Sequence, residues 1–324
     1  MSAAPAATDR VAFAVAAILV SAFAHSAGSA IVALANTRFP VWQLYVLRSL
    51  LVVPALVVLL HRADPGGSLM PRRVGWVALR SALLVGMWVA YYAALSEIEL
   101  SLAAAIYHTS PLLIVPLSAA LAGERVGWTV RAGAAIGFAG VLVILRPDAG
   151  PIDGHAVLPF VAAALNAAAM VLTRVRCADE SPLGLALALN LALGAAGLAG
   201  AAACAALPVP GELEAANPFL FGEWRALGAR EWTVLGALAV TMVVGSVGAA
   251  YAYQNAPSPI VATFDYAYLV FAGLWAMLLF GAFPDPAAWT GMALIAAGGA
   301  LAMRRGRAGP RPGPAGPLAC APVR

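Results

Sequence analysis

Apolar runs long enough to form membrane helices recur along nearly the whole chain, separated by short polar connections. A helix needs about 17 to 25 apolar residues to cross the roughly 30 Å hydrocarbon core of a bilayer. The chain is 62% hydrophobic and only 10% charged, whereas an average soluble domain carries about 25% charged residues. A water-exposed surface could not be covered by so few charges. We therefore predict an all-α integral membrane protein.

Polar connections divide the apolar residues into ten predicted spans. They are residues 11–34, 41–60, 74–96, 101–121, 128–145, 156–173, 183–207, 232–253, 260–280 and 287–303. Residues 1–10 form a polar start. Residues 304–324 are rich in Arg, Gly, Pro and Ala, which predicts a disordered tail because this composition can bury little apolar surface.

Arginines gather at one set of span ends. If the N-terminus lies inside, 14 of the 19 basic residues fall on the inner side, among them Arg10, Arg62, Arg125, Arg174 and Arg304. Cytoplasmic loops carry the excess of basic residues, so we predict a multi-pass protein of the cytoplasmic membrane with both termini in the cytoplasm. The tail arginines are expected to contact anionic membrane lipids.

The sequence lacks the residues that several classes of function require. Every basic residue is an arginine, so the lysine of a Walker A phosphate loop is missing. The arginines lie at span ends rather than on one basic face, which argues against nucleic acid as a partner. The three cysteines, Cys177, Cys204 and Cys320, have no C-x-x-C spacing, so neither a disulfide framework nor a metal site is indicated. No cofactor is predicted.

The chain repeats weakly with a shift of 158 residues. This shift sets Gly123 on Gly281 and matches eight of the 46 positions over residues 101–146. Each half, residues 11–147 and 148–303, would hold five spans, and an odd number of spans inverts the second half. We therefore predict two inverted five-helix repeats, in which Gly133, Gly137 and Gly140 let the fifth helix pack closely against a neighbour.

The element Gly123-Glu124-Arg125, the glycines that follow it and the two halves of five spans resemble the EamA-type branch of the drug/metabolite transporter superfamily. The resemblance covers nearly the whole chain and implies transport of a small organic solute, with export favoured. Phe264-Asp265-Tyr266 is similar to members that transport metabolites or S-adenosylmethionine. The second half departs from the pattern, because Gly281-Ala282-Phe283-Pro284 stands where Gly-Glu-Arg is expected.

Ionisable groups inside the spans are the first candidates for substrate binding, because such groups face the protein interior or a water-filled cavity. Asp265 and Tyr266 in the ninth span correspond under the shift to Tyr107 and His108 in the fourth. We expect these two clusters to face one central cavity, where Asp265 binds a cationic or hydrogen-bonding part of the substrate, or a proton. The alternative is that Asp265 pairs with a structural partner such as Arg48.

Other polar and aromatic residues are secondary candidates. His25 with Ser26 and Ser29 would line the cavity or only pack between helices, and Arg48 would bind an anion or act as a structural clamp. Substrate rings would contact Trp88, Tyr91, Tyr92, Tyr251 and Tyr253, although aromatic residues also gather at membrane interfaces. Pro111 and Pro116 remove backbone donors from the fourth span, which predicts a kink or hinge.

These features predict a secondary transporter that works by alternating access and is not an enzyme. Coupling to protons through Asp265 or His108 and facilitated diffusion both stay open. An integral membrane enzyme acting on lipid or isoprenoid substrates is the alternative, but the chain has no Asp-x-x-x-Asp or His-Glu-x-x-His arrangement. A scaffold or receptor is a third alternative, against which the polar residues at matching depth in both halves argue. The substrate and the oligomeric state are not predicted.

Overall fold

The protein was analysed as a computed structural model that describes residues 7–35, 40–66, 68–94, 100–124, 126–146, 157–206, 218–222 and 224–306. Within these ranges the chain forms helices and no strand. In chain order the helices are α1 (Ala7–Ala35), α2 (Val41–Ala63), α3 (Val74–Ala94), α4 (Leu100–Tyr107), α5 (Ser110–Ala122), α6 (Trp128–Leu145), α7 (Val157–Arg176), α8 (Pro182–Ala206), α10 (Pro218–Phe221), α11 (Ala229–Asn255), α12 (Ser258–Asp265), α13 (Ala267–Phe280) and α14 (Pro286–Gly306).

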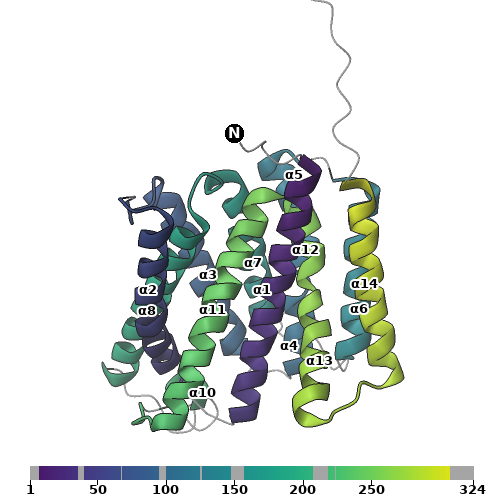
Figure 1. Ribbon diagram of the computed structural model, residues 1–324. Coiled ribbons are helices and arrows are strands. Elements are labelled where there is room, and N and C mark those ends of the chain that lie inside the picture. The colour runs from purple at the N-terminus through teal and green to yellow at the C-terminus, as the bar shows by residue number, and fades with distance from the viewer. Residues whose placement is uncertain are drawn as a thin grey trace, which may run out of the picture.

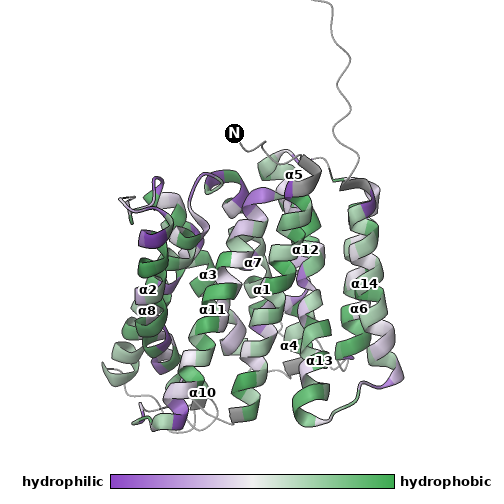
Figure 2. Ribbon diagram, viewed as in Figure 1, coloured by the Kyte–Doolittle hydropathy of each residue, from purple (hydrophilic) through white to green (hydrophobic). Residues whose placement is uncertain are grey.

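The described helices supply ten candidate membrane spans, which confirms the predicted number. They form a bundle with apolar residues along the length of the helices and hydrophilic residues mostly near the two ends (Figure 2). Phe13, Leu50 and Val240 are among the large apolar side chains exposed on its outside. Lipid offers backbone groups no hydrogen-bond partner, so helices that satisfy their own backbone are the structure that such runs must adopt.

Two predicted spans are broken helices. The fourth consists of α4 and α5, and the ninth consists of α12 and α13. Leu100 begins α4 and Ser258 begins α12, 158 positions later, while Tyr107 and Asp265 end these two helices at the same shift. Gly123 and Gly281 then end α5 and α13, both with φ of 63°. This left-handed conformation favours glycine because it has no Cβ.

The two broken spans run in opposite directions. Figure 1 places α4 below α5, whereas α12 lies above α13. The N-terminal end of α1 and the C-terminal end of α14 lie on the same side of the bundle (Figure 1). The antiparallel course of the matched pairs supports the predicted inversion, which has the odd number of spans per half as its physical cause.

Close packing of α6 along α14 joins the fifth and tenth spans. A Cβ added to Gly133 would lie 2.6 Å from the carbonyl oxygen of Gly298, and one added to Gly140 would lie 2.6 Å from that of Gly291. Only glycine permits this backbone approach, as expected for small residues between membrane helices. Gly137 has a different neighbour, because the Tyr266 ring occupies the place of its missing side chain.

The ends of the chain differ slightly from expectation. α14 continues through Gly306 instead of ending at Met303, so the first residues of the predicted tail are helical. The rest of that tail, residues 307–324, lies outside the described residues, as do the polar start at residues 1–6 and Arg125 of the Gly-Glu-Arg element.

Candidate functional site

Asp265 is the last residue of α12, at the break before α13. Its carboxylate oxygen Oδ2 accepts a hydrogen bond from the Tyr253 hydroxyl at 2.5 Å, and Tyr253 lies on α11. The side chain of Tyr253 is fully buried, while Asp265 is half-buried. The hydrogen-bond partner of Asp265 is thus a tyrosine of the adjacent helix, in place of Arg48, which was the alternative expected from the sequence.

His108 lies at the other break, between α4 and α5. Its ring nitrogen Nδ1 is 2.7 Å from the carbonyl oxygen of Ala104, which can only accept, so Nδ1 carries the proton. In the neutral ring Nε2 is then left as a hydrogen-bond acceptor. Pro111 follows in the first turn of α5 and cannot donate a backbone hydrogen bond, which explains the break. α5 continues through Pro116, so the structure places no interruption there.

The two breaks meet inside the bundle. The ring of His108 stacks on that of Tyr266, with centroids 6.5 Å apart, and lies 6.3 Å from the ring of Tyr268. Tyr266 is fully buried, and its hydroxyl has no hydrogen-bond partner among the described residues. A buried unpaired hydroxyl costs about 1–3 kcal/mol. A polar ligand atom would remove that cost.

Aromatic side chains extend this contact toward α3. The ring centroid of Tyr107 is 5.6 Å from that of His108 and 5.2 Å from that of Tyr91. Tyr91 contacts Tyr92, which stacks on Trp88 at 5.4 Å. Trp88, Tyr91, Tyr92, Tyr107, His108, Tyr266 and Tyr268 therefore form one connected set, which we call the aromatic cluster.

Three predicted site residues are not members of the cluster, although Arg48 interacts electrostatically with both Tyr92 and His25. His25 packs against α11, where a Cβ added to Gly245 would lie 2.4 Å from its Nε2. Arg48 lies over the Tyr45 ring at 5.8 Å, and its Nε has no hydrogen-bond partner among the described residues. Tyr251 is 37% exposed on α11, whereas Tyr253, two positions later, is buried and donates to Asp265.

Some connections of the site were not expected from the sequence. Ser29 on α1 hydrogen-bonds Tyr268 on α13 at 2.9 Å, and Phe219 on α10 lies 4.9 Å from the Tyr92 ring. The Asn166 amide donates to the Ser110 hydroxyl, which joins α7 to α5. Ser29 was expected to line the cavity or only to pack between helices, but its pairing with Tyr268 in particular was not predicted.

Comparison with known proteins identifies the family. The profile of the EamA-like transporter family matches residues 12–146. A riboflavin transporter of Rhizobium johnstonii is 30% identical over 230 residues, which cover 71% of this chain and 70% of the relative. The chain belongs to the EamA-like transporter family. As a member, it is a multi-pass membrane transporter of small molecules and not an enzyme.

Two other matches cover more of this EamA-like transporter. The pseudopaline exporter CntI of Pseudomonas aeruginosa is 26% identical over 284 residues, which cover 87% of this chain and 90% of the relative. A solved crystal structure has a TM-score of 0.71 at 24% sequence identity and covers 91% of this chain and 98% of its own. The latter comparison supports the ten-helix fold and carries no information on substrate.

Proposed function

We propose that this EamA-like transporter exports a small organic metabolite across the cytoplasmic membrane by alternating access, with both termini in the cytoplasm. The substrate binds at the aromatic cluster, beside Asp265. The observation that carries the proposal is the meeting of the two helix breaks, where the His108 and Tyr266 rings stack within a membrane bundle. Discontinuous helices that end at a central site are a recurring design of secondary transporters.

Asp265 is the proposed polar anchor. Within the ten described spans the acidic residues are Glu231, at the start of α11, and Asp265. A carboxylate inside a membrane bundle is costly and commonly marks a substrate or proton pathway. Tyr253 holds the carboxylate at the break by the hydrogen bond to Oδ2. Proton coupling through Asp265 is part of the proposal, because protonation would remove the cost of the charge during each cycle.

The proposed substrate class is a planar heteroaromatic molecule with hydrogen-bonding groups. Flat rings gain from stacking against aromatic side chains, and Trp88, Tyr91 and Tyr107 are such rings in the cluster that contains His108. The relatives named as riboflavin transporters fit this class. The relative named as a pseudopaline exporter supports the outward direction.

The breaks also supply the proposed motion. α4 and α5 are separated at His108 and Thr109, just before Pro111, and α12 and α13 are separated at Tyr266. Few backbone hydrogen bonds would have to break for the helix halves to tilt at these points. We propose Pro111 as the hinge on α5, so that the cluster opens alternately to the two sides.

The test is flux in proteoliposomes that contain the purified full chain, with riboflavin as a fluorescent probe and with or without an imposed pH gradient. Asp265→Asn is expected to lower the flux at least tenfold, since a hydrogen bond to a charged group contributes about 1.5–3 kcal/mol. Tyr253→Phe should lower it several-fold. Tyr251→Phe is the matched control on the same helix and should leave it unchanged, because Tyr251 is exposed.

Each outcome bears on a separate part of the proposal. If the flux of Asp265→Asn equals that of the wild type, the proposed binding site is rejected. Flux that is unaffected by the pH gradient in wild type would reject proton coupling. Transport of pseudopaline in the absence of any riboflavin transport would reject the planar substrate class while leaving the export function in place.

A further inference from the structure

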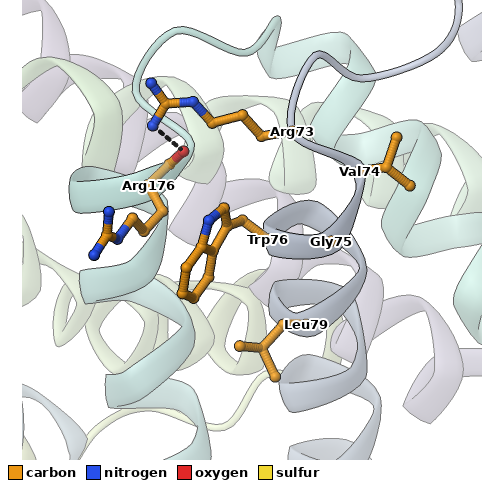
Figure 3. Close-up of a pocket in the computed structure, with 6 residues that line it drawn as sticks. All are labelled: Arg73, Val74, Gly75, Trp76, Leu79 and Arg176. Atoms are coloured by element: carbon orange, nitrogen blue, oxygen red, sulfur yellow. Dashed lines mark hydrogen bonds between the residues drawn. The ribbon is translucent and has the colours of Figure 1, made fainter.

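A hollow of about 740 Å³ opens between the start of α3 and the end of α7, at the opposite end of α3 from the aromatic cluster. Its lining residues are Arg73, Val74, Gly75, Trp76, Leu79 and Arg176 (Figure 3). None of them belongs to the candidate site described above.

The hollow crosses the expected boundary between head groups and hydrocarbon. The span on α3 begins at Val74, and the span on α7 ends at Arg176. Leu79 lies five residues further into α3, about 7.5 Å along the helix at 1.5 Å per residue. The arginines are therefore at the level of the polar head groups, and the apolar lining reaches into the acyl-chain region.

Two guanidinium groups lie at the polar end of the hollow. The Arg176 guanidinium lies 4.9 Å from the Trp76 ring centroid, and Arg73 Nη1 donates to the Arg176 carbonyl oxygen at 3.4 Å (Figure 3). Arg73 also lies 3.5 Å from the Asp179 carboxylate, an exposed pair. Among the described residues, no carboxylate pairs with Arg176.

The neighbouring acidic residue, Glu180, already forms hydrogen bonds with the backbone. The Glu180 carboxylate accepts hydrogen bonds from the backbone N–H groups of Arg72 and Arg73, at 3.1 and 2.7 Å. It thereby fixes the chain that enters α3 and holds Arg73 at the rim. Among the side chains that the structure describes, Arg176 has no paired carboxylate, and it lines the hollow as a cation.

The apolar lining of the hollow is partly exposed over one turn and a half of helix. Val74 is 45% exposed, Trp76 is 40% exposed and Leu79 is 44% exposed. Tryptophan prefers the interface between head groups and acyl chains, and a guanidinium is the side chain best suited to bind phosphate. From the membrane surface inward, the hollow presents arginine, then tryptophan, then apolar side chains. This order is complementary to a molecule with an anionic head group and an apolar chain.

We propose that this hollow binds an anionic phospholipid, whose phosphate contacts Arg176 and Arg73 and whose acyl chain lies along Trp76 and Leu79. In the proposed orientation the site faces the cytoplasmic leaflet, where anionic lipids are enriched and basic pockets between helices bind their head groups. The bound lipid would contact both the start of α3 and the end of α7. These two helices are not consecutive in the chain, because α4, α5 and α6 lie between them.

The experiment measures the thermal unfolding of the purified full chain in neutral detergent, titrated with phosphatidylglycerol, with phosphatidylcholine or with inorganic phosphate. A ligand of the folded state raises the apparent Tm in proportion to the logarithm of its concentration above Kd. Phosphatidylglycerol should raise the Tm of wild type by several degrees, and phosphatidylcholine should have a much smaller effect. Inorganic phosphate alone should have none, because it lacks the acyl chain.

Arg176→Gln should weaken the apparent affinity for phosphatidylglycerol at least tenfold. Arg62→Gln is the matched control, because Arg62 is an exposed arginine at the end of α2 outside the hollow. Arg176→Lys keeps the charge and should retain an intermediate response, which separates lipid binding from a folding defect. Equal shifts in Arg176→Gln and wild type would overturn the proposal, and so would a shift with inorganic phosphate as large as that with the lipid.

Discussion

Arg174 Nε on α7 lies 3.5 Å from Glu124 Oε1, in the turn between α5 and α6. The same arginine donates to the carbonyl oxygen of Gln254 near the end of α11. Arg174 thus connects three parts of the bundle on the side of the termini, and two of them lie in the second half of the chain. The Glu124 side chain is only 16% exposed, and its Oε2 has no hydrogen-bond partner among the described residues.

The two partners of this ion pair are expected to respond unequally to mutation. Arg174→Ala would remove the ionic partner of the Glu124 carboxylate and the donor to the Gln254 carbonyl, which should lower stability by about 1–3 kcal/mol. Glu124→Gln removes a charge that burial disfavours, so its cost should be smaller, about 1 kcal/mol or less. Thermal melts of the two variants in detergent check this order, and a lower Tm for Glu124→Gln than for Arg174→Ala would contradict it.

The stability of the folded protein should depend on pH through the titration of Glu124. Burial raises the pKa of this carboxyl above its ordinary value, and Arg174 opposes the increase only in part. The folded state therefore holds the proton to higher pH than the unfolded state, so this group's contribution to stability falls as pH rises through the folded pKa. Without Arg174 the decrease should be steeper, since the ionised carboxylate has lost its partner.

Melts of wild type, Arg174→Ala and the double variant Arg174→Ala/Glu124→Gln between about pH 4.5 and 8 provide the measurement, a range that starts near the ordinary carboxyl pKa. The deficit of Arg174→Ala should shrink toward low pH, and the double variant should lack the extra pH dependence. A deficit that stays constant over the range would show that Glu124 titration is not its cause.

Gly140→Ala should disrupt the contact between α6 and α14. The added Cβ would lie 2.6 Å from the Gly291 carbonyl oxygen, so the helices would have to separate. Overpacking of this kind costs about 1–3 kcal/mol. Gly236→Ala on α11 is the matched control, because nothing lies within 4 Å of its added Cβ, and alanine favours a helix by up to about 1 kcal/mol. Equal Tm values for the two variants would argue against tight packing at Gly140.

Gly137→Ala should impair transport through Tyr266. Its Cβ would lie 2.6 Å from the Tyr266 ring atom Cδ2, so the ring would have to leave its place beside His108. We expect riboflavin flux in proteoliposomes to fall at least tenfold, a loss of about 1.4 kcal/mol or more in transition-state stabilisation. Gly236→Ala again serves as the control and should transport normally. Normal flux in Gly137→Ala would show that transport does not depend on the position of the Tyr266 ring.

The orientation can be measured by cysteine labelling. With Cys177, Cys204 and Cys320 replaced by serine, a single cysteine is placed at Ser68, between α2 and α3, or at Phe283, between α13 and α14. Both positions are exposed, Phe283 to 79%. A membrane-impermeant maleimide applied to intact cells should label Phe283→Cys and leave Ser68→Cys unlabelled. The reverse pattern would place the termini outside.

Several features of the site were visible in the sequence. The shift of 158 residues put Tyr107 opposite Asp265, and the structure ends α4 and α12 at these two residues. Pro111 predicted an interruption because proline lacks a backbone donor, and α4 does end just before it. The break at Tyr266 has no proline beside it, so only its correspondence with the first half could have indicated it.

Which aromatic residues join the site was decided by packing. Tyr251 and Tyr253 are both tyrosines of the same apolar span, so the sequence does not distinguish them. In the structure Tyr253 binds Asp265, whereas Tyr251 is exposed. A helix that is apolar all round has no polar face to tell which side turns toward lipid. Arg48 is a similar case, since its place over Tyr45 depends on how α2 is rotated within the bundle.

The sequence by itself determined the ten membrane-spanning segments, including the bounds of α6 at Trp128–Leu145. Crossing a bilayer depends on a contiguous apolar run whose backbone hydrogen bonds are satisfied within the helix, and both are local properties. The tertiary structure alone decided that His108 stacks on Tyr266 and that Arg176 lies over Trp76. These contacts depend on helix rotation and on close backbone approach between spans, which an apolar pattern does not encode.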